Sequence, residues 1–314
     1  MRRSLIAAAS TAVLLVSSAR VAQAQKPLGF ERFTVADVAT GVDFGLTELE
    51  VFEKYAAELP LVGSPNRPIH GQKDKRLIDI EVRPDGSGLA VYVYDVVWVQ
   101  NTGSFQLDSW FLPDLNEQQV KSLESLQGVV ILDIERYPRG KSWRYSVILQ
   151  RNTDNTPWKL LLHTSTHSIL EAMIPPGPPP YFRPVDIDVT AVTGAGFEDI
   201  YDAVLIQRLG VNNVVYVAPL LLQPQVYDAF NNANHQLVDQ EILGGGLGSF
   251  GLDGYYMDIF IDSGLSFTAG FELTQQQVED AHVHVGRVVD LEGRLVINSP
   301  QSNEMRYYTV HMNH

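Results

Sequence analysis

The sequence of 314 residues contains no cysteine, so neither disulfide bonds nor thiol catalysis is available to it. A chain without disulfides takes its stability from buried apolar side chains, and 45% of its residues are hydrophobic. The length is sufficient for a sizeable core. The composition therefore predicts a folded protein, built either as one large domain or as one array of repeated units.

Long apolar runs are also missing, apart from one short run near the N-terminus. This run extends from Leu5 to Val16, follows Arg2 and Arg3, and precedes a small-residue cleavage site that ends at Ala24. A membrane helix needs about 20 apolar residues, so the run is too short to span a bilayer. The sequence predicts a signal peptide over residues 1–24, cleavage near Ala24, and a secreted or periplasmic protein without a membrane span.

Basic residues are few in comparison with acidic ones. Removal of the signal peptide takes three of the 23 Lys and Arg residues, which leaves 20 against 37 Asp and Glu and a net charge of −17. Binding to nucleic acid or to an anionic membrane surface needs basic patches. The charge balance therefore argues against both as partners and is compatible with a neutral or cationic ligand.

A pair of acidic residues two positions apart recurs at nearly constant spacing. The pairs are Asp79/Glu81, Asp133/Glu135, Asp186/Asp188, Asp239/Glu241 and Asp290/Glu292, and the intervals between their first members are 54, 53, 53 and 51 residues. Apolar and β-branched residues surround most of the pairs, which is typical of strands. The constant interval indicates tandem repeats.

A second strand pattern keeps step with the first. It begins at Tyr94, Tyr145, Tyr201, Tyr256 and Tyr307, with Val or Ile three positions later in every copy. Helical stretches precede the strand pairs at residues 46–52, 115–126, 164–173, 224–238 and 273–278. The sequence thus predicts an α+β fold of about five helix–strand–strand units, at residues 46–101, 102–152, 153–210, 211–263 and 264–314, after an N-terminal lead of residues 25–45.

These motifs resemble the tandem-repeat domain that precedes the serine-hydrolase domain of polyglycine hydrolases, and similar arrays in related bacterial secreted proteins. The resemblance covers residues 46–314 and rests on the Arg-x-x-Asp strand (Arg76, Arg183 and Arg287), the Tyr-x-x-Val-Trp strand and the Leu-Thr-x-x-x-Val helix. It implies a curved antiparallel sheet, an open half-barrel with helices on one face, and a role in recognition. The family nucleophile lies in Ser-x-x-Lys, which this sequence lacks, so the hydrolase activity is not carried over.

The repeated acidic pairs are the first candidate site. Residues two apart on a strand share a face, so the ten carboxylates form a row across the units. One interpretation is a calcium site or a groove for a cationic polymer, because hard cations take clustered carboxylate oxygens. The alternative is a structural ladder, in which each Asp bonds the backbone or an Arg of a neighbouring strand. No other cofactor is predicted.

The tryptophans are the second candidate site. Trp98, Trp110, Trp143 and Trp158 all fall in the first two units, where they form either a surface for sugars or peptide chains or simply better packed cores. Two histidines, His163 and His167, are four apart and fit one helical face, but zinc needs a further ligand placed by the fold.

We therefore expect a non-catalytic secreted module that binds a protein or a cell-wall or glycan polymer. Two alternatives stay open at this stage. One is a peptide or glycan hydrolase with a site of acidic residues, and the other is a structural partner of a second secreted protein.

Overall fold

The computed structural model describes residues 39–55, 74–87, 91–102, 106–153, 155–173, 181–191, 200–208, 215–222, 236–243, 255–261, 267–284, 286–299 and 302–313. The predicted signal peptide, residues 25–38 of the lead and most of the helix predicted at residues 224–238 lie outside these ranges. No helix within the described ranges is both long and apolar enough to cross a membrane.

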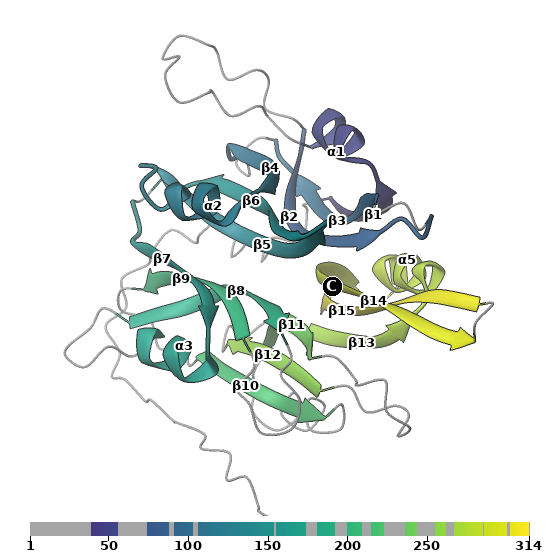
Figure 1. Ribbon diagram of the computed structural model, residues 1–314. Coiled ribbons are helices and arrows are strands. Elements are labelled where there is room, and N and C mark those ends of the chain that lie inside the picture. Colours follow the sequence, from purple (N-terminus) through teal and green to yellow (C-terminus); the bar gives the residue numbers. More distant parts are fainter. Residues whose placement is uncertain are drawn as a thin grey trace, which may run out of the picture.

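The fold is mostly β, with small open antiparallel sheets and a few short helices (Figure 1). In chain order the elements are β1 (Thr40–Leu46), α1 (Glu48–Lys54), β2 (Lys75–Pro84), β3 (Tyr92–Gln100), β4 (Ser109–Leu115), α2 (Glu117–Leu123), β5 (Val129–Arg139), β6 (Ser142–Arg151), β7 (Trp158–Thr164), α3 (Thr166–Met173), β8 (Tyr181–Ala191), β9 (Ile200–Arg208), β10 (Val215–Leu222), β11 (Gln236–Leu243), β12 (Tyr255–Ile261), β13 (Phe267–Leu273), α5 (Gln275–His284), β14 (Gly286–Ser299) and β15 (Ser302–Asn313).

The strands form five three-stranded sheets with one common order. These are β1-β3-β2, β4-β6-β5, β7-β9-β8, β10-β12-β11 and β13-β15-β14, called here the first to the fifth sheet. In each sheet the last strand in the chain lies in the middle, and the first strand is an edge that the sequence analysis did not predict. The predicted single curved sheet is thus replaced by five separate ones, since backbone hydrogen bonds do not join them into a continuous sheet.

A β-bulge occurs at the same place in the second strand of every sheet. The pairing with the middle strand skips one residue directly before the first Asp of each acidic pair, at Ile78, Leu132, Val185, Val238 and Val289. A bulge bends the strand and redirects the side chains next to it. In the first three sheets the Asp that follows reaches a neighbouring sheet.

Aspartate side chains connect adjacent sheets. Oδ2 of Asp133 accepts a hydrogen bond from the backbone N–H of Ile80 at 2.7 Å, and Oδ2 of Asp186 accepts one from Ile134 at 2.9 Å. Oδ2 of Asp79 accepts one from Leu291 at 2.9 Å. Each donor directly follows the Asp of its own sheet, so these three contacts repeat one geometry. We call them the aspartate ladder.

The second strands form a closed ring. They contact one another in the order β2, β5, β8, β11 and β14, and β14 also contacts β2. The contact between Asp79 and Leu291 belongs to this last junction. Figure 1 shows the sheets grouped around a common centre, with α1, α2 and α3 at the periphery. The two ends of the series are therefore in contact.

The hydrophobic cores lie between sheets as well as beneath helices. One core combines residues of the first sheet with Phe111 and Ile148 of the second sheet. It also includes Val278 of α5 and Leu291 of β14 in the fifth sheet. Another combines the second sheet with Leu160 and Val204 of the third. Because neighbouring sheets share their buried apolar area, each sheet depends on the next for stability.

Gly41 in β1 makes room for a tryptophan. It lies opposite Trp98, and a Cβ at this position would be 2.4 Å from Cζ2 of that ring. The ring has little freedom to move because Lys75 Nζ lies 3.6 Å from its centroid and Tyr55 stacks at 6.5 Å. Replacing Gly41 by Ala is expected to lower the free energy of unfolding by about 1–3 kcal/mol. Urea denaturation checks this: an unchanged midpoint would contradict the prediction, and adding Trp98→Leu should restore part of the loss.

Candidate functional site

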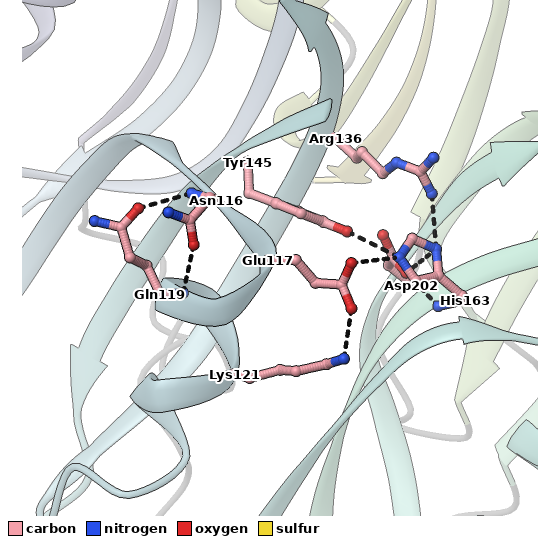
Figure 2. A network of polar contacts seen from close by, with 8 residues as sticks. All are labelled: Asn116, Glu117, Gln119, Lys121, Arg136, Tyr145, His163 and Asp202. Carbon is pink, nitrogen blue, oxygen red and sulfur yellow. Dashed lines mark hydrogen bonds and ion pairs between the residues drawn. The ribbon is translucent and has the colours of Figure 1, made fainter. Parts of the chain in front are cut away.

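A network of polar side chains lies where the second sheet meets the third (Figure 2). Its members, called here the His163 network, are Glu117, Lys121, Arg136, Tyr145, His163 and Asp202. The second-sheet region supplies α2, β5 and β6, and the third supplies β7 and β9. Asn116 fixes the start of α2 in a capping box with Gln119, which positions Glu117 as the first helical residue.

His163 reaches the network because the edge strand β7 bulges. Its pairing with β9 shifts between Leu161 and Thr164, and His163 has a left-handed backbone with φ of 53°. Its backbone N–H donates to Oδ1 of Asp202 at 2.6 Å. Gly45 in the first sheet has the same arrangement, since its N–H donates to Oδ1 of Asp95 at 2.6 Å. The bulge turns the imidazole away from its own strand toward the second sheet.

The hydrogen bonds of His163 define its tautomer. Arg136 only donates, so its Nη1, 2.9 Å from Nδ1 of His163, requires that Nδ1 be the acceptor. Nε2 then carries the proton and donates to Oε2 of Glu117 at 3.2 Å. The Tyr145 hydroxyl lies 3.5 Å from the same Nε2. The geometry is that of a neutral ring held at both nitrogens.

Asp202 is the buried anion of the network. It has no exposed surface, and within the described residues its Oδ2 has no hydrogen-bond partner. Burial raises the pKa of Asp202, against the opposing effects of the hydrogen bond from the His163 backbone N–H, the charge of Arg136 and the Tyr145 hydroxyl. The partly exposed Glu117 behaves oppositely, since hydrogen bonds from Lys121 and His163 lower its pKa.

Trp143 extends the network to the protein surface. Its side chain is 49% exposed, and the Arg136 guanidinium lies 4.2 Å from its ring centroid in a cation–π contact. Arg136 therefore joins an exposed indole to the imidazole of His163. We call Trp143, Arg136, His163 and Glu117 the Trp143 surface.

The corresponding junction between the first and second sheets has different chemistry. Arg136 pairs with Tyr145 across β5 and β6, whereas Val82 pairs with Tyr94 across β2 and β3. There Ser146 takes the place of Asp202, and its hydroxyl donates to the Tyr94 hydroxyl at 3.4 Å. The packing of two sheets thus does not require the charged groups of the His163 network.

The network is better suited to holding a ligand than to transferring protons. The lone pair of His163 Nδ1 is engaged by Arg136, so the ring is not free to accept a proton from a substrate. Burial raises the pKa of Tyr145, which keeps its hydroxyl protonated. The network instead offers an exposed aromatic ring, a half-buried cation and a partly exposed carboxylate, linked through Arg136 and His163.

Four aspartates of the acidic row have a structural role. Asp79, Asp133 and Asp186 form the aspartate ladder. Oδ2 of Asp188 accepts a hydrogen bond from the backbone N–H of Arg136 at 2.9 Å. Glu81 is buried and Glu135 is half-buried. The side chains of Asp239, Glu241, Asp290 and Glu292 lie outside the described part of the structure. In the rest, no three His, Cys, Asp or Glu side chains are grouped so as to hold a metal ion.

The structure separates the four tryptophans. Trp110 is 3% exposed, and the half-buried Trp98 and Trp158 pack against the cores. Only Trp143 among the four is exposed, so they do not form one aromatic surface. The two histidines are also apart in structure: His163 lies on β7, whereas His167 lies on α3, where it pairs with Glu171 at 3.2 Å.

No protein-family model matches the chain, and no curated protein matches its sequence. The interpretation of the site therefore rests on its geometry. Sequence reasoning missed Glu117, Arg136 and Asp202. For Arg136 the available signal is a departure from the repeated pattern, because the aligned position of the first unit carries Val82; Asp202 gives no such signal, since Asp95 has the same position after a Tyr.

Proposed function

We propose that this protein is a non-catalytic, exported binding module, and that it holds a protein or cell-envelope polymer at the Trp143 surface. The observation that carries the proposal is the 49% exposure of Trp143, with one ring face covered by Arg136. Tryptophan and arginine dominate the binding energy of many interfaces, because each buries a large area and makes directed contacts. The ring of sheets gives this surface a rigid support.

We also propose that the five sheets are tandem units of about 53 residues, similar to the repeat domain of polyglycine hydrolases and wrapped into a curved array. Two recurring features support this proposal. The strand order is the same in all five sheets, and the bulge before the Asp recurs in every second strand. A binding role follows from the likeness, since the hydrolase motif of that family is missing from this sequence.

A hydrolase built on the acidic row is less well supported. Asp133 and Asp186 are buried and accept backbone hydrogen bonds, so those oxygens are occupied. A general acid or base must instead reach the proton that it transfers. Four aspartates of the row, Asp79, Asp133, Asp186 and Asp188, instead accept backbone hydrogen bonds that join sheets.

A pull-down assay tests the proposed function. The chain without residues 1–24 is mixed with insoluble peptidoglycan, an insoluble neutral glucan and agarose-coupled gelatin. At least one polymer should retain it, and Trp143→Ala should weaken that retention by about tenfold or more. Leu49→Ala is the control, because Leu49 is also exposed but lies on α1.

The same mixtures also test for catalysis. No soluble peptide or sugar should be released during prolonged incubation. Release of product would contradict a non-catalytic role, and retention that is unchanged by Trp143→Ala would contradict the proposed surface.

A further inference from the structure

We infer that Trp143 and the adjoining basic residues of the β5–β6 hairpin bind an acidic polypeptide segment, an inference that rests on the proposed function and names its ligand class. The observation behind it is the charge of the hairpin formed by β5 and β6. Residues 136–144 contain four basic residues and no acidic one, in a chain with a formal net charge of −14. The four are Arg136, Arg139, Lys141 and Arg144.

The positive charge of this hairpin is only partly neutralised. Asp114 accepts ion pairs from Arg139 at 2.5 Å and from Arg144 at 3.5 Å, so one carboxylate faces two guanidinium groups. Lys141 is exposed and has no ion pair or hydrogen bond with the described residues. The guanidinium of Arg136 contacts the ring of His163 and the indole of Trp143, and its charge also acts on the buried Asp202, so the excess charge of the hairpin comes from Lys141 and the two arginines that share Asp114. The hairpin therefore keeps excess positive charge beside an exposed aromatic side chain.

The corresponding hairpin of the first sheet carries less positive charge. Its equivalent residues, 82–93, have Tyr92 at the position of Trp143 and contain one basic residue, Arg83, which is paired with Asp95, and one acidic residue, Asp85. Because the two hairpins join the same pair of strands in their sheets, the turn itself does not require basic residues. The charge on the β5–β6 hairpin is thus available for recognition.

The basic residues are confined to one hairpin, so a short peptide is favoured as the ligand over a polyanion that would cover a wide area of the protein surface. Nucleic acid or an anionic membrane would also face the rest of a chain whose formal net charge is −14 and would be repelled by it. A short acidic segment confines its charge to the hairpin. An apolar side chain within that segment would pack on Trp143, while its carboxylates would pair with Lys141 and compete with Asp114 for the two arginines.

Fluorescence anisotropy with labelled peptides tests the inference on the chain without residues 1–24. The probe is a synthetic peptide of alternating Glu and Leu with one central Phe, and its matched control has Lys in place of every Glu. The Glu peptide should bind at least about tenfold more tightly at low salt, and its affinity should fall toward that of the Lys peptide near 0.5 M NaCl as charges are screened.

Charge reversal on the protein gives the second arm of the test. Lys141→Glu should weaken binding of the Glu peptide by about five- to tenfold, whereas Lys54→Glu, the same change at an exposed position on α1, should leave it within about twofold. Since Lys141 has no partner among the described residues, its replacement should not change the melting temperature.

Three outcomes would overturn the inference. The first is equal binding of the two peptides, and the second is equal effects of Lys141→Glu and Lys54→Glu. The third is tighter binding of polygalacturonate, an anionic glycan, than of the Glu peptide. If a polymer is retained in a way that depends on Trp143 but not on Lys141, only the inference of an acidic ligand is refuted and the proposed surface stands. If the retention does not depend on Trp143, the proposed surface itself is refuted.

Discussion

Replacing Asp95 by Asn is expected to lower the free energy of unfolding by about 3 kcal/mol, the cost of breaking a buried ion pair. Asp95 has no exposed surface, and its two oxygens accept hydrogen bonds from Arg83 at 2.6 and 3.0 Å. An amide has no charge and cannot accept both, so the largely buried guanidinium would lose its counterion. Urea denaturation followed by circular dichroism measures the loss.

Asp202→Asn is the matched variant, and the opposite result is expected from it. Asp202 has the same position after a Tyr and the same bond to a bulged backbone amide, but it lacks a bidentate arginine. Burial raises the pKa of Asp202. The free energy of unfolding that this shift contributes is therefore fully present below the unfolded pKa of about 3.9, where the carboxyl is protonated, and it is lost as the pH rises through the folded pKa. Asn removes the buried charge and keeps an oxygen for His163 N–H.

At neutral pH, Asp202→Asn should therefore be as stable as the original protein or more stable by on the order of 1 kcal/mol. The two proteins should converge in stability as the pH falls toward 4. A loss at pH 7 as large as that of Asp95→Asn would show that Asp202 is paired as strongly as Asp95, against the geometry.

Removal of one step of the aspartate ladder is the second large effect. Asp133→Ala leaves the Ile80 N–H without its acceptor inside the protein, which should cost about 1–3 kcal/mol. Asp280→Ala on α5 is the control, because Asp280 is exposed and should change stability by less than about 0.5 kcal/mol.

Hydrogen exchange locates the effect of the ladder. Asp79→Ala should accelerate exchange of the Leu291 amide, although the two residues are 212 positions apart in the sequence. Exchange that changes only around residue 79 would contradict a direct link between the first and fifth sheets.

The parts of the fold that could be predicted are those with a regular local signal. The strands around Asp79 and Tyr94 are short runs rich in β-branched and aromatic residues, and α2 begins after a capping Asn116. The edge strands β1, β4 and β7 were missed because they are short and a left-handed residue interrupts each of them, at Gly45, Asp114 and His163. A bulge shifts the alternation on which strand prediction depends.

Relations between sheets could not be predicted from local patterns. The spacing of Asp79, Asp133 and Asp186 indicated a row, but whether neighbouring strands pair through their backbones or through side chains depends on where the bulge turns each Asp. The site has the same limit, because Arg136 and His163 are 27 residues apart and meet only when two sheets pack. Trp143 is one of the four tryptophans of the second candidate site, and only its exposure in the folded protein distinguishes it from the other three.

The closed ring also constrains the order in which the chain can fold. Val278 and Leu291 belong to the same core as Leu46. The apolar face of the first sheet is therefore not fully covered until residues near the C-terminus have folded onto it. Contacts of such long sequence separation slow folding. Until these contacts form, the backbone groups of the edge strand β2 are exposed and can pair with a strand of another chain. Shortening the protein from its C-terminus should therefore promote aggregation through its N-terminal part, far from the residues removed.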